Sequence, residues 1–194
     1  MTNARRESKK VITRDAVHNV KIKQVCGDAP KSIYRKAVRQ AILTTLRSEA
    51  VDIPCFLSVL ITDDKGIRDY NVEYRFVDKA TDVLSFPMQR FDEPGWHGRG
   101  GMEVDRDTGM LPLGDIILSA QHIKRQAHTH GHSVLRETAH LTIHSTLHLL
   151  GYDHDNKDNN RVMRRKEKRL LRKLGYILTV YKADTVRMMR KNNK

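Results

Sequence analysis

Apolar and polar positions follow two different spacings along the chain, and each spacing predicts one kind of element. Short runs of branched apolar residues, or their alternation with polar ones, predict strands at residues 17–25, 53–62, 81–87 and 113–119. Apolar residues three or four positions apart predict helices at residues 32–48, 67–76, 119–128, 133–150 and 156–174. Strands and helices are therefore interspersed, and 194 residues suit a single domain.

The helix predicted at 133–150 has a recognisable start. Ser133 can cap it, and Glu137 in the first turn suits the positive end of the helix dipole. Four apolar residues share a face with a stripe of histidines or lie beside it: Leu135, Ala139, Ile143 and Leu147. We therefore expect a largely buried helix whose histidines open onto a cleft.

Three segments lack a periodic pattern. Residues 1–15 are polar and are expected to form a flexible extension, and residues 181–194 a basic, disordered tail, which leaves 16–180 as the folded domain. Residues 92–113 are rich in glycine and charge and predict a long surface loop. Loops of this length in small domains are often functional or mobile.

Cysteine content and hydropathy point to the cell interior. Cys26 and Cys55 do not form a C-x-x-C pair, so a disulfide framework is not expected and a reducing compartment suits the protein. No apolar run approaches the roughly 18 residues of a membrane span, and the N-terminal residues lack the apolar region of a secretory signal. We expect a cytoplasmic protein that does not bind membranes.

Positive charge is concentrated at one end of the chain. The formal net charge is +13, and residues 156–194 contain fourteen Lys or Arg against three Asp or Glu, which gives +11. Such a segment is typical of a protein that binds a polyanion, although a solvated helix face is the plain alternative. Four side chains are our candidates for steering such a polyanion: Arg164, Arg165, Lys168 and Arg172.

A set of closely spaced histidines predicts a metal site. Residues 144–154 read HSTLHLLGYDH, which places His144 and His148 one turn apart on one helix face. Gly151 suits a left-handed turn that ends the helix and returns His154 to the same ion. Three imidazoles with an open fourth position describe a catalytic site for one zinc ion, although nickel, copper or iron would also bind such a set.

Further histidines precede this set. His128, His130 and His132 can be read as a loose second metal tract, but loop residues are the simpler interpretation. His140, one turn before His144, either lines the cleft, orients a ligand or packs against the core.

The same spacing occurs in metzincin proteases, which have H-E-x-x-H-x-x-G-x-x-H. Their glutamate is the general base, and Ser145 occupies that position here. A serine cannot accept the proton of a zinc-bound water at neutral pH, so peptide hydrolysis is disfavoured. A bound metal can still activate water and neutralise negative charge, which together with the basic segment favours phosphodiester cleavage.

Three stretches together resemble the YbeY endoribonucleases. Residues 140–154 resemble the histidine signature of that family, Tyr74-Arg75 with residues 81–87 (TDVLSFP) its central motif, and residues 114–119 (GDIILS) its G-D-I-x-I-S strand. The resemblance implies a small α+β domain with a mixed sheet of about four strands, packed by about five or six helices. It also implies a single-strand-specific, metal-dependent endoribonuclease of bacterial cytoplasm and organelles.

The resemblance carries further expectations. It implies maturation of the 3′ end of 16S ribosomal RNA and ribosome quality control, with ribosomal RNA, the small subunit and its proteins as partners, and no DNA. His144, His148 and His154 correspond to the metal ligands and Arg75 to the active-site arginine, for which phosphate binding is natural. His140 is a catalytic candidate by position.

The chain departs from the family at Ser145, where glycine is usual, and in the longer 92–113 loop. A non-catalytic ribosome assembly factor with a structural metal is an alternative reading of the same residues. The RNA substrate, the general base and the oligomeric state are left open.

Overall fold

The predicted strands form one mixed sheet. In the computed structural model the strands are β1 (Asn19–Gln24), β2 (Cys55–Thr62), β3 (Val83–Pro87) and β4 (Leu111–Ser119). Their order in the sheet is β1-β2-β4-β3. The pairs β1–β2 and β2–β4 are parallel, whereas β3 pairs with β4 in the antiparallel direction.

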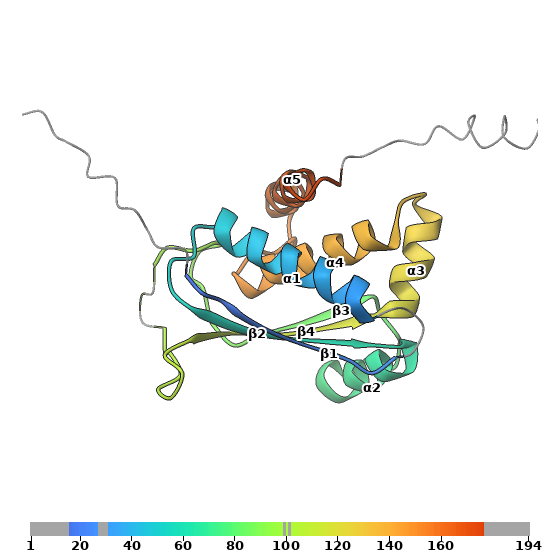
Figure 1. Ribbon diagram of the computed structural model, residues 1–194, viewed down its shortest axis with the longest axis horizontal. Coiled ribbons are helices and arrows are strands. Elements are labelled where there is room, and N and C mark those ends of the chain that lie inside the picture. The colour runs from blue at the N-terminus through green and yellow to red at the C-terminus, as the bar shows by residue number, and fades with distance from the viewer. Residues whose placement is uncertain (1–15, 27–30, 99, 101, 177–194) are drawn as a thin grey trace, which may run out of the picture.

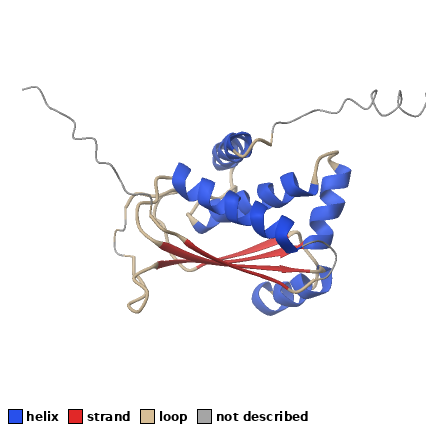
Figure 2. Ribbon diagram, in the orientation of Figure 1, coloured by secondary structure: helices blue, strands red, loops and turns tan. Residues whose placement is uncertain are grey.

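Helices cover both faces of this sheet unequally. The described elements are α1 (Lys31–Ser48), α2 (Asp64–Arg75), α3 (Ala120–Thr129), α4 (Val134–Leu149) and α5 (Lys157–Lys173). Figure 1 shows α1, α3 and α4 on one side of the sheet and α2 on the other, with α5 outermost on the side of α1 and α4. Figure 2 shows the same helices above and below the strands. The predicted α+β class is confirmed.

The structure describes residues 16–26, 31–98, 100 and 102–176. The predicted extension at 1–15 and the predicted tail at 181–194 lie outside these residues. Among the described helices, none has both the length and the apolar character needed to cross a bilayer.

The main core lies between the sheet and the layer of α1 and α4. Alternate residues of β2, beginning at Cys55, are buried in it. A smaller cluster of Ile67, Leu84 and Ile117 lies under α2 on the other face. Each large apolar side chain buried in this way contributes roughly 1.5–3 kcal/mol.

The strand β4 contains a one-residue bulge where it pairs with β2. Phe56 pairs with Pro112 and Leu57 with Gly114, so Leu113 is an extra residue. Gly114 has φ of +140°, and a Cβ there would lie 2.2 Å from the Phe86 carbonyl oxygen. Only glycine allows the chain of β3 to approach so closely.

The helix α4 begins and packs as its sequence predicts. The Ser133 side chain accepts a hydrogen bond from the Arg136 backbone N–H at 3.2 Å. Ala139, Ile143 and Leu147 are fully buried. Leu135 was expected on the same face, but it is 37 % exposed, because the first turn of α4 is left uncovered there by the described elements.

Candidate metal centre

The end of α4 and the turn after it bring the three predicted ligands together. The rings of His144 and His148 have centroids 4.6 Å apart. Gly151 then adopts φ of +81°, and a Cβ there would lie 2.7 Å from the Cβ of Phe91. This left-handed turn reverses the chain, so that the His154 ring centroid lies 5.5 Å from that of His144 and 5.0 Å from that of His148.

The donor atoms of these histidines fit one metal ion. One ring nitrogen from each of His144, His148 and His154 lies within 4.8 Å of the others. The Nε2 atoms of His144 and His148 are 3.2 Å apart. Two ligand nitrogens on a tetrahedral zinc ion are separated by roughly 3.3 Å, given Zn–N bonds of about 2.0–2.1 Å. The side chains are therefore close to the arrangement that zinc requires.

Glu167 of α5 orients one of these ligands. Its Oε1 atom lies 2.8 Å from Nδ1 of His144, which leaves Nε2 of that ring free to face an ion. Burial raises the pKa of Glu167, but the contacts with His140 and His144 outweigh burial and lower the pKa to about 2. Glu167 was not among the site residues predicted from the sequence. The feature of the sequence that could have revealed it is an acidic residue on the apolar face of a basic helix, beside Met163 and Leu170.

His140 lies between two carboxylates. Its Nε2 atom is 3.6 Å from Oε2 of Glu167, and its Nδ1 atom is 3.9 Å from Oε1 of Glu137. Burial lowers the pKa of His140, but contacts with Glu137 and Glu167 outweigh burial and raise it to about 9. The imidazole is therefore charged at neutral pH. A charged imidazole suits contact with a phosphate or donation of a proton, and it cannot accept a proton from water.

Arg75 faces the same cavity from the opposite side. A cavity of about 760 Å³ is lined by Arg75 and Ser85 and by His140 and the three predicted ligands. The Arg75 guanidinium donates to the Ser85 carbonyl oxygen at 3.2 Å and lies 5.9 Å from the Phe86 ring centroid. It has no carboxylate partner among the described residues, so its charge is available to an anion.

A larger cavity of about 890 Å³ lies beside the glycine-rich loop. It contains none of the three predicted metal ligands, and four of its lining residues are acidic: Asp92, Glu93, Glu103 and Asp105. These carboxylates would repel a polyanion. The smaller cavity is therefore the better candidate for the functional site.

The basic side chains of α5 divide between two edges of the helix. Lys166 contacts Glu49, and Arg169 and Lys173 donate to the Ser48 hydroxyl, so this edge faces the end of α1. The four predicted RNA-binding residues are exposed and have no ion pair within the described part of the chain: Arg164, Arg165, Lys168 and Arg172.

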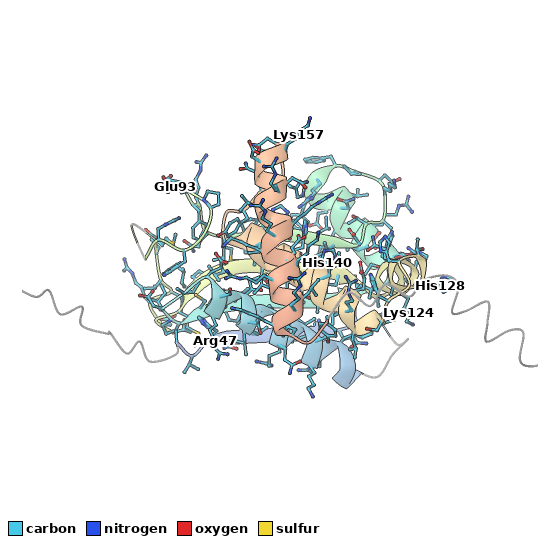
Figure 3. The ribbon with its side chains drawn as sticks, turned by 90° about the horizontal axis from the view of Figure 1, so that it is seen from above. Arg47, Glu93, Lys124, His128, His140 and Lys157 are labelled. Atoms are coloured by element: carbon cyan, nitrogen blue, oxygen red, sulfur yellow. The ribbon has the colours of Figure 1, made fainter. Side chains whose placement is uncertain are left out.

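At about 100° per residue, Arg164 and Lys168 lie on the edge of α5 opposite α1, and Arg165 lies nearly opposite Glu167 on the outer face. Figure 3 shows His140 beside the middle of α5. The edge of α5 that carries Arg164 and Lys168 therefore lies on the same side of the helix as the metal centre.

A buried carboxylate holds the turn that carries His154. Glu49 accepts a hydrogen bond from the Tyr152 hydroxyl at 2.6 Å and is bound by Lys166 at 2.8 Å. The Lys166 ammonium also lies 4.7 Å from the Tyr152 ring centroid. The end of α1, the 151–154 turn and α5 are thus joined at one point.

Ser145 faces away from the cavity. It is fully buried, and its hydroxyl has no hydrogen-bond partner within the described residues. The residue after the first ligand therefore presents neither a carboxylate nor any other group to the metal centre, which counts against the protease alternative.

Comparison with known proteins gives a consistent result. A sequence model of the family described as Endoribonuclease YbeY matches residues 19–175. A Clostridium botulinum (strain Loch Maree) protein named Endoribonuclease YbeY is 42 % identical over 144 residues, which cover 72 % of this chain and 87 % of the relative. A Caldanaerobacter subterraneus protein of the same name is 43 % identical over 138 residues, or 71 % of this chain and 85 % of the relative.

A solved structure was also matched. The solution structure of a Thermotoga maritima protein aligns with a TM-score of 0.49 and 21 % sequence identity, covering 80 % of this chain and 91 % of that chain. The match of the family model extends from β1 to the end of α5 and includes the histidine signature, Arg75 and the GDIILS strand. The resemblance seen in the sequence is confirmed, and the chain belongs to the Endoribonuclease YbeY family.

Proposed function

We propose that the protein is a zinc-dependent endoribonuclease that cuts single-stranded RNA in the cytoplasm. Its substrate is ribosomal RNA, with roles in maturation of the 3′ end of 16S RNA and in ribosome quality control beside the small subunit and its proteins. One observation carries the proposal: Arg75 and the three histidines line one cavity although they come from distant parts of the chain.

The residues of this cavity suit phosphodiester chemistry. His144, His148 and His154 would hold the ion, which supplies Lewis acidity and lowers the pKa of bound water. Arg75 binds a phosphate oxygen at the cavity wall, and its planar guanidinium can make two parallel hydrogen bonds there. His140 lies between Glu137 and Glu167, lines the same cavity and adds positive charge beside the same phosphate. The exposed cations of α5 attract the flanking RNA.

The number of ligands supports catalysis over a structural role for the metal. The cluster that can hold an ion consists of three histidines, and the described residues supply no fourth side chain to it. His154 is exposed, so one side of the centre is open to solvent. A structural zinc site is usually closed by a fourth protein ligand. These features make the non-catalytic assembly factor the weaker alternative.

The test is cleavage of a labelled single-stranded RNA by wild type and His148→Ala, with His128→Ala as the control. We expect His148→Ala to lose the ion of this centre and RNA cleavage together, while filter binding of RNA is retained because α5 is unchanged. His128 lies on α3 outside the three-histidine cluster, so its variant should cleave normally. Full cleavage by chelator-treated His148→Ala protein would overturn the proposal.

A further inference from the structure

A second cluster of metal-binding side chains lies at the joint between α3 and α4. It consists of His130 and His132 in the turn and Glu137 in the first turn of α4, and one donor atom from each lies within 4.8 Å of the others. The sequence pointed to His128 as a member of this tract. The structure instead supplies Glu137, because the turn folds back over the start of α4.

The two histidines are arranged as metal ligands are. Their ring centroids are 5.6 Å apart. The Nδ1 atom of His132 lies 3.4 Å from the Ser133 carbonyl oxygen, which directs Nε2 of this ring toward Glu137. Metal-binding histidines commonly have their other ring nitrogen held by a carbonyl or carboxylate oxygen in this way.

The buried carboxylate of Glu137 indicates that a cation binds in this cluster. It is 2 % exposed, and its Oε2 atom is buried without a hydrogen-bond donor among the described residues. The Nε2 atom of His132 lies 3.0 Å from this oxygen, which is an ion pair only when the imidazole is protonated, and the two atoms lack the geometry of a hydrogen bond. A buried carboxylate oxygen that lacks a donor is destabilising. A cation held between these atoms would satisfy it.

We propose that His130, His132 and Glu137 form a second metal site, for a divalent transition metal of the zinc class. Two imidazoles and one carboxylate are a ligand set that zinc uses in proteins. His130 is exposed, so an ion can enter from solvent and retain water there. His130 and Glu137 also line the 760 Å³ cavity of the three-histidine centre. The second ion would therefore lie in the same cavity.

The test counts zinc ions per chain after equilibrium dialysis of metal-stripped full-length protein. Wild type should bind two ions. His130→Ala should bind one, and His148→Ala should also bind one. The double variant should bind none. His128→Ala, altered in the same histidine-rich segment but outside the cluster, should still bind two.

His130 is on the surface, so its replacement should leave the fold intact, which circular dichroism can verify. Glu137→Gln gives an independent check, because it retains the shape of the side chain and removes the charge that the ion requires. When cobalt replaces zinc, the ion at the second site should add its own absorption bands in the visible spectrum. The His130 variant should lack these bands. One ion per chain in wild type, or two in His130→Ala, would overturn the proposal. Neither result depends on RNA cleavage.

Discussion

Glu167 contacts His144, one of the three predicted metal ligands, and so limits the orientation and protonation of that ring. A free histidine ring can rotate and can carry its proton on either nitrogen. The contact from Nδ1 of His144 to Glu167 fixes both the orientation of the ring and the position of the proton. Carboxylate partners of this kind also make the ligand a stronger base.

We expect Glu167→Gln to weaken zinc binding by roughly 10–100-fold, the effect usual for loss of such a partner. The amide is uncharged, so it supports the His144 ring less well than a carboxylate does. Competition with a fluorescent zinc chelator measures the change. Asp158→Asn removes the other acid of α5, which is exposed at the helix start, and should leave the zinc affinity unchanged. Equal losses in the two variants would show that charge on α5, and not contact with His144, sets the affinity.

The three histidines of the centre could be predicted from the sequence, whereas the two acidic residues near them could not. His144, His148 and His154 are predictable because helix periodicity and Gly151 place them locally. Glu167 and Glu137 reach the site through tertiary packing of α5 and through the fold of the turn before α4. Local spacing carries no information about either contact. Both acids had to be found in the structure.

At the scale of elements, the joint between α2 and α3 positions Arg75. Asp64 at the start of α2 binds Ser119, His122 and Arg125 at the end of β4 and in α3. Burial raises the pKa of Asp64, but hydrogen bonds from Arg125, Ser119 and His122 outweigh burial and lower it to about 2. Since Arg75 ends the same helix, this joint fixes the helix that delivers the guanidinium to the cavity.

The lowered pKa makes a pH-dependent prediction. Because the pKa of Asp64 is lower when folded than its ordinary value of 3.8, its charge stabilises the fold above about pH 4. This contribution is lost as pH falls toward about 2. Asp64→Asn should therefore lower the midpoint of urea unfolding at pH 6, and its difference from wild type should shrink below pH 4.

Asp78→Asn is a suitable control for this series, because Asp78 forms an exposed pair with Arg68 and should contribute little. A constant difference between Asp64→Asn and wild type from pH 6 to pH 3 would contradict the assignment.

The positions of strands and helices were predictable, whereas their pairing was not. Caps at Ser119 and Ser133 are readable because they depend on adjacent residues. The bulge at Leu113 depends on alignment with β2, more than fifty residues away. Gly114 is required by the Phe86 carbonyl of the neighbouring strand. Such features depend on contacts that exist only once the sheet has formed.

At the scale of the molecule, the two edges of α5 differ in how far their positive side chains are already engaged within the protein. One edge of α5 is engaged with the end of α1 through Lys166, Arg169 and Lys173. Arg164, Arg165, Lys168 and Arg172 have no ion pair among the described residues, whereas Arg161 pairs with Asp158 at 3.7 Å. These four side chains are therefore available to an anion. Phosphate contacts of this kind provide affinity that depends strongly on salt.

We expect the combined change of Arg164, Lys168 and Arg172 to Ala to weaken binding of single-stranded RNA and to flatten its salt dependence. Loss of three contacts should reduce the slope of log K against log salt by about 2. Fluorescence anisotropy at several salt concentrations measures this slope. Arg169→Ala with Lys173→Ala removes cations from the edge facing α1 and should change the slope less per charge. Equal effects per charge would indicate diffuse attraction without a defined RNA surface.

The helix α5 carries Glu167 toward the metal centre and presents Arg164 and Lys168 on its adjoining edge. On the proposed function, binding of an ion to the three histidines and binding of RNA to α5 would therefore both depend on the position of that helix. Two ligands that favour one placement of a shared element are thermodynamically linked. If the ion changes the affinity for RNA, RNA must change the affinity for the ion by the same factor. On the proposed function, we therefore expect bound RNA to slow the loss of the ion, and the RNA-free protein to lose its ion to a chelator faster.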